Sequence, residues 1–94
     1  TPAPAPAGDR RGRAYLRFTV ADRPGVLAEL TAAMRDAGVS IESLIQRGAS
    51  DDGNVLIAMV THVGPERAVV DALDRLEGSQ SLAGKPMLMH ILDD

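Results

Sequence analysis

The stretch Asp22-Arg23-Pro24-Gly25-Val26-Leu27 contains the residue types that could bind a small zwitterion. It lies between a run with strand periodicity and a run with helical periodicity, and Asp22 is predicted as the N-cap of that helix. The unsatisfied N–H groups and positive dipole end of a helix start favour a carboxylate. The Asp22 carboxylate could accept from an ammonium group, and Gly25 allows a ligand close to the backbone. The same residues also suit an ordinary capped helix start, which is the simpler interpretation.

Other groupings of reactive side chains are sparse. The absence of Cys excludes disulfides, thiolate nucleophiles and cysteine-bound metal sites, and it fits a cytoplasmic location. His62 and His90 lack the spacing of a zinc site, and no serine, histidine and carboxylate frame is visible. The run 51–54 lacks the remaining ligands of a calcium loop and has the composition of a turn. We therefore predict no catalytic residue, no metal site and no cofactor in this chain.

Six elements are predicted from the spacing of apolar residues. They are a strand over 14–21, a helix from 26 to its cap at Gly38, strands over 39–47 and 55–62, a helix from Gly64-Pro65 to Gly78, and a strand over 86–92. In the second strand, Val39, Ile41 and Ile45 are expected on one face. Leu44 falls out of phase with them.

The order β-α-β-β-α-β, with a hairpin in the middle, predicts a ferredoxin-like α+β fold. We expect a four-stranded antiparallel sheet with the first and third strands in its centre and both helices on one face. The strands over 55–62 and 86–92 are apolar on both sides. Because large exposed apolar patches mark contact sites, we expect self-association or docking onto a larger protein.

Residues 1–13 differ from the rest of the chain, because three prolines alternate with alanine and precede three arginines. This composition predicts a flexible arm or interdomain linker, with residues 14–94 as the folded domain. The arm has a charge of +2, which leaves −5 on the rest of a chain whose formal net charge is −3. A nucleic-acid-binding arm is the alternative, but three arginines without aromatic residues make a small electrostatic footprint.

The composition of the domain argues against several partner classes. Its negative charge opposes phosphate binding, and only Tyr15 and Phe18 are available for stacking on bases. The longest apolar runs are far shorter than the ~20 residues of a membrane-spanning helix. We predict no nucleic-acid partner and no membrane span. The chain begins with Thr1 rather than Met, so we expect a piece of a longer protein.

Two motifs resemble a known family. The run D-R-P-G-V-L-A-E-L after the first strand and the run G-V-S-I-E-S-L-I-Q at the second resemble the ACT domain, a small regulatory module that binds amino acids. The resemblance covers roughly residues 14–92, and the order of elements agrees. S-I-E-S-L-I-Q before a glycine-containing hairpin is most similar to the C-terminal ACT domain of bacterial homoserine dehydrogenases. Those enzymes interconvert homoserine and aspartate semialdehyde with NAD(P), in the pathway to threonine and methionine.

The resemblance implies a ligand held between two protomers, by the loop after the first strand and by the start of the neighbour's second strand. The residues that it assigns to this role are Asp22, Gly25, Val26 and Leu27, together with Ser40 and Ile41 across the interface. Several relatives have Asn where this chain has Ser40, whose hydroxyl reaches less far. Gln46 could bind a ligand hydroxyl such as that of threonine, or could be a polar residue at a strand edge.

The implied function is feedback sensing of threonine or a related amino acid in the cytoplasm. The implied partners are a second copy of the chain and the catalytic domains of a parent homoserine dehydrogenase, where NAD(P) would bind. One alternative is a purely structural dimerisation module. Another is an ACT domain from a stringent-response synthetase, an acetolactate synthase regulatory subunit or phosphoglycerate dehydrogenase.

Overall fold

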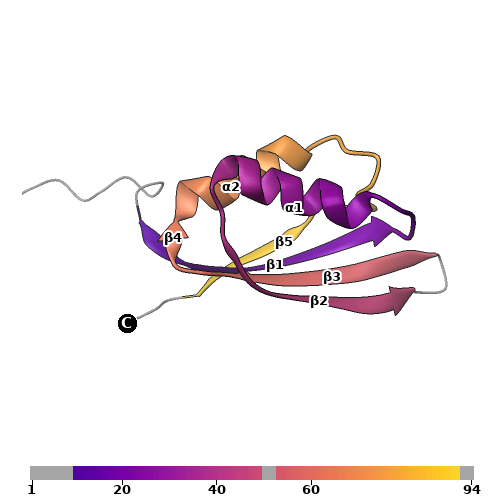
Figure 1. The fold of residues 1–94 in the computed structure, drawn as a ribbon, viewed down its shortest axis with the longest axis horizontal. Helices are drawn as coiled ribbons and strands as arrows, with labels where there is room; N and C mark the ends of the chain where they lie inside the picture. The colour runs from indigo at the N-terminus through magenta and orange to yellow at the C-terminus, as the bar shows by residue number, and fades with distance from the viewer. Residues whose placement is uncertain (1–9, 50–52, 92–94) are drawn as a thin grey trace, which may run out of the picture.

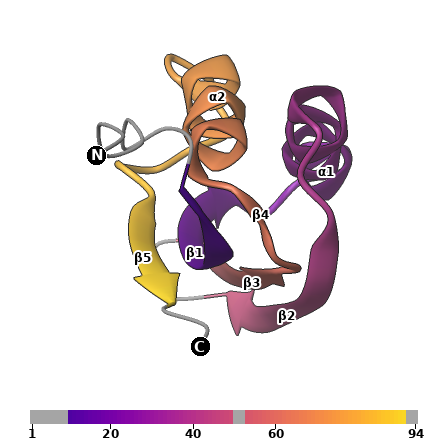
Figure 2. The same cartoon turned by 90° about the vertical axis from the view of Figure 1, so that its left-hand side faces the viewer.

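The structure, a computed structural model, describes residues 10–49 and 53–91 of the chain (Figure 1). The elements are β1 (Arg11–Ala21), α1 (Val26–Ala37), β2 (Ile41–Ala49), β3 (Asn54–Thr61), β4 (Gly64–Pro65), α2 (Glu66–Leu76) and β5 (Met87–Ile91). The long strands form an antiparallel sheet in the order β2-β3-β1, with β5 on the other side of β1. Both helices cover one face of this sheet (Figure 2). The predicted ferredoxin-like arrangement, with the first and third strands in the centre, is confirmed.

Strand β1 is central because its alternate residues are buried. Ala14, Leu16, Phe18 and Val20 are each at most 1% exposed, and they face the helices. β1 pairs with β3 in a register that joins Phe18 to Ile57, and with β5 in a register that joins Leu16 to Leu88. Since neighbours on both sides fix this strand, the position of its last residue, Ala21, is also fixed.

The helices complete the core with one face each. The buried residues of α1 are Val26, Leu30, Ala33 and Met34, and those of α2 are Val69, Ala72 and Leu76. α1 ends as predicted at Gly38, which has a left-handed φ of 83°. Neither helix in the described ranges is long and apolar enough to cross a membrane.

The sheet has five strands in the described residues, and not the four predicted. The additional strand, β4, pairs with Arg11 and Gly12, so β1 begins three residues before the predicted strand. The Glu66 N–H donates to the Arg10 carbonyl at 2.7 Å, which holds the chain before α2 against the start of β1. Residues 11–13 of the predicted arm therefore belong to the sheet. Residues 1–9 lie outside the described part of the chain.

The prediction that Ile45 shares a buried face with Ile41 is wrong, because β2 contains a β-bulge. Ile41 pairs with Thr61 and Ser43 pairs with Val60, so the strand has one residue more than its partner here. An additional residue reverses the alternation beyond it. Leu44 consequently packs against the core, while Ile45 is 59% exposed.

The face of the sheet opposite the helices has no covering element among the described residues (Figure 2). Exposed apolar side chains lie on this open face from both edge strands: Ile45, Met87, Met89 and Ile91. The first belongs to β2, and the other three pair with residues on the outer side of β1. The expected apolar surface on the far side of the sheet is therefore present, with β5 as its largest contributor.

The bulge predicts that substitutions at two adjacent residues of β2 change the stability of the domain by different amounts. Leu44→Ala removes a side chain that packs against the core, and we expect a loss of about 1–3 kcal/mol in the free energy of unfolding. Ile45→Ala changes an exposed side chain, and we expect less than about 0.5 kcal/mol. Urea unfolding of both variants measures the difference, and a larger loss for Ile45→Ala would contradict the register of β2.

Candidate functional site

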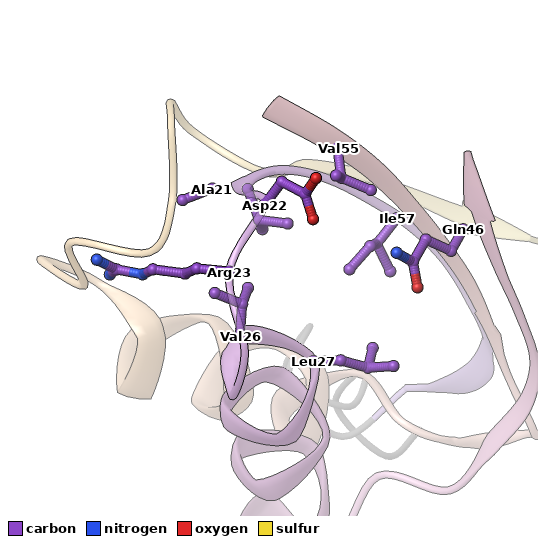
Figure 3. A pocket seen from close by; sticks show the side chains of 9 residues that line it. Ala21, Asp22, Arg23, Val26, Leu27, Gln46, Val55 and Ile57 are labelled. Carbon is purple, nitrogen blue, oxygen red and sulfur yellow. The ribbon is translucent and has the colours of Figure 1, made fainter. Parts of the chain in front are cut away.

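A small cavity lies where β1 ends and α1 begins (Figure 3). Its volume is about 50 Å³, well below the about 300–1,000 Å³ typical of small-molecule sites. Its lining residues come from β1 and the following loop, from α1, and from β2 and β3: Val20, Ala21, Asp22, Arg23, Val26, Leu27, Gln46, Val55 and Ile57. The structure thus brings together four of the predicted site residues, Asp22, Val26, Leu27 and Gln46.

The prediction that Asp22 caps α1 is wrong. The N-cap is Gly25, which has a left-handed φ of 89°, and no side chain caps the helix. The Arg23 N–H donates to the Ala21 carbonyl at 3.1 Å, and the first helical hydrogen bond joins the Glu29 N–H to the Gly25 carbonyl at 3.0 Å. Residues 23–25 therefore separate Asp22 from the first residue of the helix. The Asp22 carboxylate has no hydrogen bond or ion pair to a described residue, and it points toward the cavity (Figure 3).

Gly25, another predicted site residue, does not line the cavity but is the N-cap of α1. Its left-handed conformation is costly for other residues, although an added Cβ would meet no atom within 4 Å. Because helical bonding starts with Glu29, the N–H groups of Val26, Leu27 and Ala28 have no backbone acceptor within the described residues. Three backbone donors are thus available at this end of α1.

Gln46 faces the cavity because of the bulge in β2. It pairs with Ile57, a core residue that faces the helices, so its side chain is on the same side of the sheet. Figure 3 shows its amide directed toward the space between Ile57 and Leu27. Val26, Val55 and Ile57 are at most 4% exposed and form an apolar floor beneath the two polar side chains.

Ser40 and Ile41 do not lie at the cavity of their own chain. They follow the C-terminal end of α1, whereas the cavity is at its N-terminal end (Figure 1). Twelve helical residues separate the two ends by about 18 Å. The Ser40 carbonyl accepts a hydrogen bond from the His62 N–H at 2.9 Å, and Ile41 packs against the core. Any contribution of these two residues to a shared site needs a second copy of the chain.

A polar cluster that the sequence did not predict contacts the loop after β1 on the side away from the cavity. The Glu29 carboxylate accepts from Ser81 Oγ at 2.7 Å and from Ser79 Oγ, and Arg23 Nη2 donates to Ser81 Oγ at 3.3 Å. The hydrogen bonds from Ser79 and then Ser81, helped by the charge of Arg23, hold the pKa of Glu29 below its ordinary value despite partial desolvation. In the sequence, the one local sign of this cluster is an acidic residue, Glu29, in the first turn of a helix. Its serine partners are about 50 residues away in sequence.

The cluster predicts a pH-dependent contribution to stability. The folded state lowers the pKa of Glu29, so this contribution is present above the ordinary value of about 4.5 and is lost as the pH falls through the lower folded value. Glu29→Gln should therefore have a lower urea midpoint than wild type at pH 7, and the gap should narrow toward pH 3. Glu77→Gln removes a carboxylate outside the cluster and is the control. A difference in urea midpoint between wild type and Glu29→Gln that stays constant between pH 7 and pH 3 would contradict the stabilising role of the Glu29 carboxylate.

Within the described residues, no group of three His, Asp or Glu side chains is placed to hold a metal ion. The arrangement instead combines one unpaired carboxylate, one amide and three backbone donors above an apolar floor. These groups suit a small ligand with both charges and a short side chain.

Known proteins share both the sequence and the fold. The sequence profile of the ACT domain family matches residues 14–78. Homoserine dehydrogenase of Pseudomonas aeruginosa is 38% identical over 78 residues, which are 82% of this chain and 18% of that enzyme. A crystal structure of a homoserine dehydrogenase from Thiobacillus denitrificans matches 95% of this chain, and 19% of its own, with a TM-score of 0.83 and 34% identity. The ACT domain of GTP pyrophosphokinase from Chlorobium tepidum shares the fold, with a TM-score of 0.66 at 15% identity over 85% of this chain and 100% of that one.

The match to homoserine dehydrogenases covers only a small part of those enzymes. The chain spans about a fifth of the length of the curated relatives it matches. The matched part contains the loop at Asp22 and the strand that contains Gln46, so it includes the cavity. The resemblance drawn from the two motifs is confirmed, and the chain belongs to the ACT domain family of regulatory modules.

Proposed function

We propose that this ACT domain senses threonine or a related amino acid and regulates a homoserine dehydrogenase of which it is a part. The observation that supports this most is the cavity at the start of α1, where the Asp22 carboxylate, which has no partner among residues 10–49 and 53–91, and the Gln46 amide lie above an apolar floor. The similarity to homoserine dehydrogenases supports the parent enzyme. Its NAD(P)-dependent reaction, in the cytoplasm, belongs to the catalytic domains of the parent.

Each charge of an amino acid has a counterpart in the site. The backbone donors at Val26 and Leu27 suit the ligand carboxylate, because they lie at the positive end of the α1 dipole. The Asp22 carboxylate suits the ammonium group. The apolar floor accepts the methyl group of threonine, and the Gln46 amide binds its hydroxyl. An amino acid without a hydroxyl would leave the polar amide without this partner, which is a source of selectivity.

Pairing of two chains through β2 would complete the site. Within the described residues, β2 pairs only with β3, so its other edge is open to a second copy. Antiparallel pairing of two β2 strands about a twofold axis brings the start of one strand beside the end of the other. Ser40 and Ile41 of the second copy would then approach the cavity at the Gln46 end. Such pairing also extends the sheet and protects an exposed edge.

Regulation follows from linkage between the ligand and the arrangement of the paired domains. If threonine binds one arrangement more tightly, it shifts the attached catalytic domains toward that state. Coupling of this kind is typically about 1–3 kcal/mol. The open sheet face, with its exposed apolar side chains, is available to contact the catalytic domains.

Calorimetric titration with a panel of amino acids tests the proposed ligand. We expect heat with L-threonine at micromolar to millimolar concentrations, and a weaker response to valine, which lacks the hydroxyl. Asp22→Asn removes the partner of the ammonium group and should weaken threonine binding by about tenfold or more. Asp36→Asn, on the exposed side of α1, is the matched control. No heat with any amino acid would leave the structural dimerisation module, and a response to serine or valine alone would favour another parent.

A mixing experiment tests whether two chains share each site. Asp22→Ala should damage the loop side, and Ser40→Asp, at an exposed position, should damage the side that the second copy contributes. Each variant alone should bind threonine poorly. After the two are mixed and re-equilibrated, half of the dimers are hybrids with one intact site, so about a quarter of the wild-type sites should return. A mixture that binds no better than its components would contradict the shared site.

A further inference from the structure

The segment after α2 is attached to the end of β1 that leads into the ligand loop. The Ala21 N–H donates to the Ser81 carbonyl at 2.9 Å, and the Ala83 N–H donates to the Thr19 carbonyl at 2.8 Å. Val20 and Leu82 form an isolated β-bridge between these two bonds. The docked segment, residues 79–83, therefore lies directly behind two residues that line the cavity, Val20 and Ala21.

Ser81 is the centre of the contacts between this segment and the loop. It is a buried polar residue, only 6% exposed. Its hydroxyl donates to Glu29 at 2.7 Å and accepts from Arg23 at 3.3 Å, and its N–H donates to Ser79 Oγ at 3.1 Å. One hydroxyl thus joins the loop, the first turn of α1 and the docked segment, which are distant in sequence.

The direction of Arg23 connects this cluster to the ligand site. Figure 3 shows the Asp22 side chain directed into the cavity and the Arg23 side chain directed to the opposite side of the loop. Because the two residues are adjacent, the bond from Arg23 to Ser81 restrains rotation of the loop about its own axis. That rotation decides whether the Asp22 carboxylate faces the cavity.

We propose that Ser81 is a positioning residue of the amino-acid site, and that ligand binding is coupled to the docking of residues 79–83. Ser81 acts through Arg23 and Glu29 and does not contact the ligand. The inference rests on the proposed function, because it concerns the same cavity. By reciprocity, a ligand that needs the ordered loop also stabilises the docked segment. The order of this segment therefore reports on occupancy of the site from outside the cavity.

Hydrogen exchange and calorimetry with L-threonine test this role. In ligand-free Ser81→Ala, the amides of Arg23 and Glu29 should exchange about tenfold faster than in wild type, since the two charge-assisted hydrogen bonds of the hydroxyl are lost. The affinity for L-threonine should fall by about tenfold. Ser81→Thr keeps the hydroxyl and should restore both values, whereas Asp36→Asn on the exposed side of α1 should change neither. Threonine should slow exchange of the Ala83 amide in wild type more than in Ser81→Ala.

The outcomes separate this inference from the proposed function. If wild type binds no amino acid, the proposed function and the coupling are both overturned. If Ser81→Ala binds threonine as tightly as wild type, only the positioning role is overturned. Arg23→Met is a second variant, at an exposed position that leaves the bond between Ser81 and Glu29 in place. It should also weaken threonine binding, and wild-type affinity in this variant would contradict the role of Arg23.

Discussion

The one-sided burial of β1 is the constraint on which the rest of the domain depends. Alternate residues from Ala14 to Val20 are almost completely covered by the helices, so the strand can neither slip nor turn over. β3 and β5 pair with it on either side, and the segment after α2 joins its last residues. The loop that follows Ala21 thus leaves a strand that is restrained from three directions. A ligand site built on such a strand is ordered before the ligand arrives, which lowers the entropic cost of binding.

Two irregularities, and not the regular elements, determine the chemistry of the cavity. The left-handed Gly25 ends the turn after Asp22 and leaves this carboxylate without a partner in the described residues. The bulge after Ile41 moves Gln46 to the helix side of the sheet. A regular helix cap would use the carboxylate within the protein, and a regular strand would point the amide away from the cavity. Both features therefore place a polar side chain at the cavity.

The sequence predicted the order of the elements and the centre of the sheet, because apolar periodicity is local and strong in β1, β3 and both helices. It also predicted a ligand site at the loop of Asp22 and at Gln46; the structure brings these residues to one cavity, and their binding of a ligand stays a prediction. It missed β4, because the pairing of this strand depends on contacts between residues 11–12 and 64–65. It also assigned Leu44 and Ile45 to the wrong faces of the sheet, because nothing local marks the additional residue in β2. The Glu29 cluster could not be predicted either, since its serines reach the Glu29 carboxylate only after both helices pack on the sheet. The ferredoxin-like fold thus follows from local patterns, while the details of the site follow from contacts between distant residues.

We propose that two chains hold one amino acid between the loop of one chain and the start of β2 in the other. Nitrogen–proton correlation spectra of the protein during titration with L-threonine test it most directly, because every amide reports its own surroundings. The account predicts that the backbone signals of Val26 and Leu27, the Gln46 side-chain amide, and the signals of Ser40 and Ile41 shift along one saturation curve. Since Ser40 follows the far end of α1, whose twelve residues span about 18 Å, its response would come from a paired copy. Spectra that leave these signals unchanged at saturating threonine would contradict the account.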